Sequence, residues 1–78
     1  MSQNEHPRYS MVIEWSDEDQ AYLVTLPEWT ERVIGGVVTH GETYEEAVQN
    51  GIEALKALIG WAQESGEPLP EPRVHNAA

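Results

Sequence analysis

These 78 residues are fewer than a typical domain has, so they form at most one small domain, and two-domain enzymes are excluded. With 14 acidic and 4 basic side chains the net charge is −10, which leaves no basic surface for gripping the phosphates of a nucleic acid. A hydrophobic content of 40%, including three Trp and three Tyr residues, distinguishes the chain from an acidic disordered segment. We therefore expect a folded acidic domain that does not bind nucleic acid on its own.

Several absences bear on where the chain works and how it assembles. Cysteine is absent, and Met1–Arg8 lacks the apolar segment of a signal peptide, so the cytoplasm is the expected compartment. No apolar run approaches the roughly 20 residues that a membrane-spanning helix needs. Because one small core without disulfides or a metal supplies little stability, we expect a homodimer or a higher homo-oligomer.

Two segments with period-two alternation predict an antiparallel hairpin. After a polar leader at residues 1–8, Tyr9–Trp15 alternates between apolar and polar side chains, as a half-buried strand does. Ala21–Leu26 is a second strand, because the polar Ser16–Gln20 turn precedes it and Pro27 ends it. The buried face of the first strand is expected to carry Tyr9, Met11, Ile13 and Trp15.

A third strand is predicted at Val33–His40, although two glycines interrupt it. Gly35 and Gly36 lie between its two apolar pairs, which favours a bulge or a kink at that point. The preceding Pro27–Arg32 segment fits neither strand nor helix periodicity, so we expect an irregular loop there.

One amphipathic helix is predicted over about Tyr44–Glu64. Thr43 and Glu46 have the spacing of a capping box, in which the hydroxyl accepts the Glu46 amide and the carboxylate reaches back to the Thr43 amide. Ile52 and Leu55, near the centre of the apolar arc, are expected in the core. The arc holds Tyr44, Ala47, Val48, Gly51, Ile52, Leu55, Leu58, Ile59 and Ala62.

The chain beyond the helix is expected to be extended. Ser65-Gly66 stops the helix, and the prolines within Pro68–Pro72 prevent its continuation, leaving at most a short edge strand at Leu69. The predicted fold class is α+β, a small three- to four-stranded antiparallel sheet with one amphipathic helix on one face. This domain occupies residues 9–72, and residues 73–78 are expected to be a flexible tail.

The sheet face opposite the helix has no predicted cover. Val12 and Leu23 are expected on that face, and a second copy of the chain is the simplest way to bury them. Trp61 lies just outside the apolar arc, near Ala54 and Ala57, where it would meet the tail or another subunit. We therefore assign Val12, Leu23 and Trp61 to the expected oligomer interface.

The sequence predicts no catalytic, cofactor or metal site. Glu14 is the one carboxylate within a predicted strand, whereas Asp17–Asp19 is a solvated turn. His6, His40 and His75 lack the i, i+4 spacing that places two imidazoles on one metal ion. A phosphate-binding glycine motif and a nucleophile elbow are also absent.

A large aromatic residue in the irregular loop allows two interpretations. Trp29 either folds back onto the core or stands out as the anchor of an interface. The acidic neighbours Glu28 and Glu31, together with His40 at the end of the third strand, would complete such an interface. Both alternatives stay open, with Trp29, Glu28, Glu31 and His40 as candidate partner contacts.

The order of several motifs resembles the HicB-like antitoxin family. The family pattern begins Y-S-x-x-I-E, continues with an acidic turn and a strand ending in P-E, and then has a G-[DE]-T-x-E-E-A helix start and a G-x-P-x-P end. Each motif is weak alone, but their order and spacing are specific. The matching residues, from Tyr9 to about Pro72, include Glu14, Trp15, Asp17, Tyr22, Pro27, Glu28, Gly41, Thr43, Glu45, Glu46, Ala47 and Pro68.

The resemblance implies a partial ribonuclease-H-like fold of β-β-β-α-β order without nuclease activity. It also implies an antitoxin that neutralises a small basic HicA-like messenger-RNA interferase by covering the toxin's RNA-binding and catalytic surface. The net charge of −10 suits a basic toxin, because opposite charges steer the encounter. A solitary homo-oligomer that has lost its toxin and a small hydrolase remain as alternatives.

Two departures from the family pattern limit the comparison. A Trp29–Gly36 loop replaces the usual proline-glycine-cysteine loop before the third strand, so a partner contact in that loop does not transfer directly. The sequence also ends at Ala78 without a ribbon-helix-helix or helix-turn-helix segment, so we expect no operator binding by this chain alone.

Overall fold

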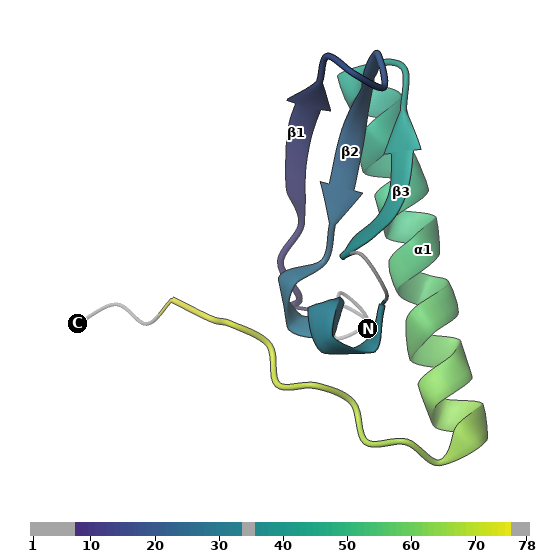
Figure 1. The fold of residues 1–78 in the computed structure, drawn as a ribbon. Helices are drawn as coiled ribbons and strands as arrows, with labels where there is room; N and C mark the ends of the chain where they lie inside the picture. The colour runs from purple at the N-terminus through teal and green to yellow at the C-terminus, as the bar shows by residue number, and fades with distance from the viewer. Residues whose placement is uncertain (1–7, 34–35, 76–78) are drawn as a thin grey trace, which may run out of the picture.

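A computed structural model describes residues 8–33 and 36–75, in which a sheet lies beside a long helix (Figure 1). The predicted α+β class, a three-stranded antiparallel sheet with one helix packed on it, is confirmed. The leader at residues 1–7 and the predicted strand positions Ile34 and Gly35 lie outside the described residues. The elements in chain order are β1 (Val12–Ser16), β2 (Ala21–Thr25), the 3₁₀ helix η2 (Pro27–Arg32), β3 (Val37–Gly41) and α1 (Tyr44–Ser65).

The sheet has the strand order β1-β2-β3, and both neighbouring pairs are antiparallel. Val24 of β2 pairs with Thr39 of β3. The next residue, Thr25, pairs with Val37, which leaves Val38 as an extra residue, a β-bulge, in β3. The sequence predicted a bulge or a kink at Gly35 and Gly36, whereas the bulge lies at Val38, within β3.

The segment expected to be an irregular loop forms the 3₁₀ helix η2. Pro27 suits the first turn of η2 for two reasons. Proline has no amide hydrogen that would need an acceptor there, and its ring fixes φ near the helical value. The Trp29 amide donates to the Leu26 carbonyl at 2.9 Å, which closes that turn. Val33 follows with extended backbone but outside the sheet, so β3 begins later than predicted. The loop prediction was wrong because a helix of six residues is too short to show periodicity.

Helix α1 begins and ends close to the predicted residues. Its N-cap is Thr43, whose Oγ1 accepts the Glu46 amide at 3.0 Å. Glu46 Oε1 accepts the Glu42 amide at 2.6 Å, one residue before the Thr43 amide that we expected. Gly66 adopts a left-handed φ of 73°, which ends the helix without the strain that a Cβ would add. Local capping chemistry therefore sets both ends of the helix.

The helix packs mainly over β2 and β3 (Figure 1), and a glycine of the helix, Gly51, lies close against side chains of the sheet layer. A Cβ on Gly51 would lie 2.8 Å from the Met11 sulfur and 3.0 Å from a Val24 methyl group, so a larger residue would push the helix away. Leu55, one turn later, is 7% exposed and lies in the core, as predicted. The core consists of Leu26, Trp29, Leu55 and Ala62, with Tyr9, Met11, Val33, Val38, Leu58 and Ile59 packed against it.

Two residues expected in the interior are more exposed than predicted. Ile52 is only partly buried, because it is turned about 100° from Gly51, which faces the sheet. Trp15 is 48% exposed, because it lies on the edge strand β1 while the helix mainly covers β2 and β3. Periodicity thus indicates which way a side chain points along its own element, but not where the helix sits across the sheet.

Beyond the helix, the chain runs extended past the end of the molecule that carries η2 (Figure 1). None of the described residues after α1 belongs to a strand, so they do not form the fourth strand allowed for at Leu69. The Tyr9 hydroxyl donates to the Pro70 carbonyl at 2.7 Å, and Arg32 donates to the Pro68 carbonyl at 2.8 Å. These two bonds hold the extended segment against the η2 end.

We predict that Leu55→Ala lowers the free energy of unfolding by about 2–5 kcal/mol, because it removes a buried side chain and leaves a cavity. Leu69→Ala is the matched control: it removes the same atoms from a side chain that is 43% exposed. The control should change stability by less than about 0.5 kcal/mol. Urea unfolding followed by circular dichroism measures both variants. A Leu55→Ala midpoint equal to that of the parent would show that α1 does not pack as described.

Candidate partner-binding surfaces

Trp29, a candidate anchor for a partner, is fully buried in the core. Tyr9 packs against it edge-on, with ring centroids 5.5 Å apart, and the Arg32 guanidinium lies 5.5 Å from its ring centroid. The indole nitrogen is also buried and finds no acceptor among the described residues. The sequence allowed Trp29 either to pack in the core or to stand out as an interface anchor, and in the structure it packs in the core. Trp29 therefore presents no surface to a partner, and its assignment as a partner contact is corrected.

Glu28, on η2, uses its carboxylate inside the molecule. It accepts the Ser10 amide at 3.0 Å, the Ser10 hydroxyl at 3.1 Å and the Arg73 amide at 2.7 Å. Partial burial alone would raise the pKa of Glu28, but these hydrogen bonds favour the carboxylate and lower the pKa below its ordinary value. Burial, and then the nearby charge of Glu28, raise the pKa of the Tyr9 hydroxyl. Glu28 thus joins the segment before β1 to the segment after α1.

Glu31 and His40 are both exposed, but they lie at different ends of the molecule. Glu31 belongs to η2, whereas His40 is near the end of β3, beside the start of α1 (Figure 1). The His40 carbonyl accepts a hydrogen bond from the Asn50 side chain of the helix at 2.8 Å. The four residues grouped as partner contacts therefore do not form one continuous surface.

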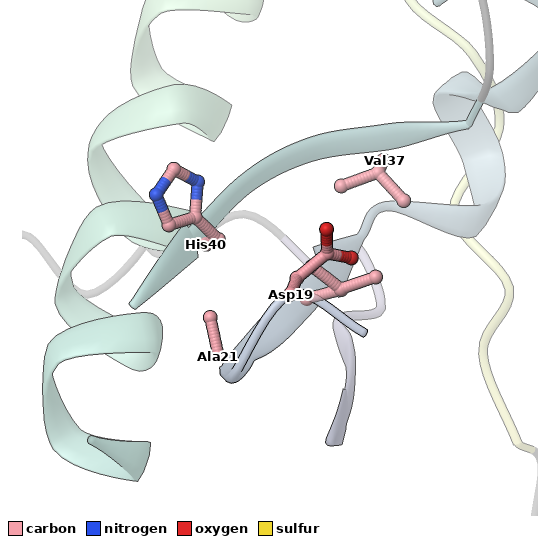
Figure 2. A pocket seen from close by; sticks show the side chains of 5 residues that line it. Asp19, Ala21, Val37 and His40 are labelled. Carbon is pink, nitrogen blue, oxygen red and sulfur yellow. The ribbon is translucent and has the colours of Figure 1, made fainter. Parts of the chain in front are cut away.

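The helix-free face of the sheet carries a shallow hollow of about 410 Å³ (Figure 2). Leu23 and His40 are direct partners across β2 and β3, so their side chains lie on the same face. Val12 belongs to this face by alternation along β1 and is 39% exposed. Val12 and Leu23 are placed as expected, while their role in assembly stays a prediction. The hollow is lined by Asp19, Ala21, Leu23, Val37 and His40.

Sequence reasoning named Leu23 and His40 but missed the other three lining residues. Asp19 comes from the turn between β1 and β2, and Ala21 and Val37 begin β2 and β3. The alternation of Ala21 with Leu23 on one strand could have placed it on this face. Whether Val37 faces the hollow depends on the bulge in β3, a pairing detail that no local pattern contains.

A second, apolar groove of about 270 Å³ lies between the edge strand β3 and the helix. Trp61 is 49% exposed and lies one turn beyond Ala57 on the same helix face. Because it belongs to the helix layer, it does not share a face with Val12 and Leu23. The three expected interface residues therefore do not form a single patch. The groove is lined by Val33, Val37, Val38, Ala54, Ala57 and Leu58.

The two hollows differ in the ionisable groups that line them. Asp19 and His40 are the ionisable groups that line the first, and apolar side chains line the second. Within residues 8–33 and 36–75, no group of three or more histidine, cysteine, aspartate or glutamate side chains is arranged to hold a metal ion. In that same part of the chain, no helix is both long and apolar enough to cross a membrane.

Comparison with known protein families assigns the chain to one of them. The family model described as "HicB_like antitoxin of bacterial toxin-antitoxin system" matches residues 9–77, nearly the whole chain. The chain is thus an antitoxin-type protein of the bacterial toxin–antitoxin class. It belongs to the HicB-like antitoxin family, so the resemblance found in the sequence is confirmed. This family implies a HicA-type toxin partner, and it is typically non-enzymatic. No curated protein and no solved structure matches the chain significantly.

We predict that Glu28→Gln lowers the free energy of unfolding at neutral pH by about 1–3 kcal/mol, because a neutral amide accepts hydrogen bonds more weakly than a carboxylate. Glu31→Gln is the matched control, since it neutralises an exposed carboxylate on the same short helix. The control should change stability by less than about 0.5 kcal/mol. Urea unfolding measures both.

The effect of Glu28→Gln should also depend on pH. The folded-state pKa of Glu28 is lowered, so its stabilisation is present above the ordinary pKa of 4.5 and is lost as the pH falls through the folded value. The stabilities of the parent and the variant should therefore converge in acid. A difference that stays constant from neutral to strongly acidic pH would contradict the hydrogen bonding described for this carboxylate.

Proposed function

We propose that this chain is the antitoxin of a toxin–antitoxin pair and neutralises a small basic HicA-like messenger-RNA interferase. The family match over residues 9–77 carries the proposal. The net charge of −10 supports it, because an acidic domain attracts a basic RNA-binding protein and competes with RNA for the same surface. The bound antitoxin covers the RNA-binding and catalytic surface of the toxin, in the cytoplasm where messenger RNA is available.

Two other functions compete with this proposal. A solitary homo-oligomer would have the same fold, and a basic open reading frame beside the gene would distinguish the antitoxin from it. A hydrolase of the two-metal nuclease type would need several carboxylates converging on ions about 4 Å apart. Glu14 is an exposed residue on an edge strand, which gives such a reaction no enclosed site. We therefore propose a binding protein without enzymatic activity.

We also propose that the chain forms a homodimer through the helix-free face of its sheet. Val12 and Val37 are 39% and 42% exposed there, on the two edge strands. A second copy over the hollow would bury them together with Leu23, which the small core alone does not do. Because each copy carries a charge of −10, dimerisation should strengthen with salt, whereas binding to a basic toxin should weaken.

Light scattering at several protein concentrations should give about twice the mass of one chain. Leu23→Asp should shift this mass toward that of a monomer, because it places a charge within the interface. Trp61→Asp, on the helix layer, is the comparison and should leave the dimer intact. A folded parent chain that stays monomeric at every concentration would contradict the dimer, and loss of the dimer in Trp61→Asp alone would place the interface on the helix.

Co-expression with the basic protein encoded beside the gene tests the antitoxin function. We expect growth to be restored, the two proteins to co-purify, and their affinity to fall as salt rises. The purified chain alone should not cleave RNA, with or without divalent metal ions. A folded chain that neither binds the toxin nor restores growth would contradict the proposal. Metal-dependent RNA cleavage that Glu14→Gln abolishes would instead support the hydrolase.

A further inference from the structure

Three aromatic side chains pack together where the sheet meets the start of the helix. We call this cluster, Trp15, Tyr22 and Tyr44, the aromatic end. Trp15 and Tyr22 are direct partners across β1 and β2, with ring centroids 5.0 Å apart. Tyr22 and Tyr44 lie 5.7 Å apart with their ring planes at 89°. This edge-to-face packing joins β1, β2 and the first residue of α1 into one unit.

The aromatic end is exposed in spite of this packing. Trp15 is 48% exposed and Tyr44 is 56% exposed, and neither belongs to the core cluster. The indole N–H of Trp15 donates to Asp17 at 2.7 Å, which fixes the orientation of the ring. Trp and Tyr are enriched at the energetic centres of protein interfaces, and ordered rings lose little entropy on binding. The cluster therefore has the composition and the rigidity of a binding hot spot.

Carboxylates flank the aromatic end. The turn between β1 and β2 and the connection from β3 to α1 both lie at this end of the molecule (Figure 1). The sequence contains no lysine or arginine from residue 9 to 31 or from 33 to 55, so neither connection carries a cation that could balance its charge. The six carboxylates of the two connections and the first helical turn belong to Asp17, Glu18, Asp19, Glu42, Glu45 and Glu46.

We propose that the aromatic end is the surface on which this chain docks its basic protein partner. Arginine and lysine side chains of the partner stack on Trp15 and Tyr44 and pair with the flanking carboxylates. Arginine suits both neighbours, because a guanidinium group stacks on an aromatic ring and also bonds a carboxylate through two nitrogens. The inference rests on the proposed antitoxin function and identifies the part of the chain that would perform it.

Charge selects a basic protein over the other possible occupants. A second copy of the chain would bring an identical set of carboxylates to this surface, and like-charge repulsion disfavours that arrangement. A nucleic acid would bring phosphates to the same negative surface. The hollow and the groove described above carry fewer carboxylates than the aromatic end. Asp19 is the one carboxylate that lines the hollow, and none lines the groove.

Trp61 provides a matched comparison within the same chain. It is 49% exposed, almost the same fraction as Trp15. It lies near the other end of α1, on the helix face that carries Ala54 and Ala57 beside the apolar groove. Substitution of these two tryptophans therefore separates an effect of the aromatic end from a general loss of exposed indole surface.

The first test uses hexaarginine amide as a probe and the indole N–H signals of the three tryptophans as reporters in nuclear magnetic resonance spectra. We expect the Trp15 signal to shift progressively with added peptide, while the signals of Trp61 and the buried Trp29 move little. Hexaglutamate is the control peptide and should shift none of them. An unmoved Trp15 signal, or an equal or larger shift at Trp61, would overturn the inference.

The second test measures the affinity for the basic toxin encoded beside the gene. Trp15→Ala should weaken binding about tenfold or more, whereas Trp61→Ala should weaken it less than about twofold. Tyr44→Ala is the second variant, at an exposed helical position where alanine is favourable. Each of the two variants removes one ring that packs against Tyr22, so the fold of both has to be checked. Circular dichroism and thermal melts check the fold of each variant.

The outcomes distinguish this inference from the function on which it rests. If the parent chain binds the toxin and both aromatic variants bind it equally well, the docking surface is wrong while the antitoxin function stands. If Trp61→Ala alone loses binding, the toxin docks at the apolar groove instead. If the folded parent chain does not bind the toxin at all, the proposed function and this inference both fall.

Discussion

The packing of Trp29 in the core is the constraint on which the rest of this small fold depends. The largest fully buried side chain among the described residues comes from the short 3₁₀ helix η2, so η2 has to fold for the indole to reach Leu26 and Leu55. Tyr9 packs against the same indole and in turn donates to the Pro70 carbonyl. Segments before the first strand and after the last helix are thus tied to a single ring, which compensates for the small number of buried residues.

This arrangement gives the molecule two unlike ends. At the η2 end, polar groups bond with one another, as Glu28 does with the Arg73 amide and Arg32 with the Pro68 carbonyl. At the other end, aromatic rings and carboxylates stay exposed. Two of the four arginine and lysine residues take part in the η2 contacts, Arg32 through its guanidinium group and Arg73 through its backbone amide.

Local chemistry is enough to predict the helix, because Thr43 and Gly66 determine its ends with bonds to residues close in sequence. The burial of Trp29 could not be predicted, since η2 has no periodicity and the neighbours of the indole come from distant parts of the chain. The candidate site was harder still. The contact chain from Trp15 to Tyr44 depends on pairing across three elements, which alternation along any one strand does not reveal.

The proline-rich segment after the helix also limits how these chains can aggregate. Pro68, Pro70 and Pro72 have no amide hydrogen, so every second residue of this stretch is unable to donate to a neighbouring strand. The carbonyls of the first two already accept bonds from Arg32 and Tyr9. An extended segment of this kind is a poor template for strand addition, because an incoming strand would find few free amide donors and carbonyl acceptors along it.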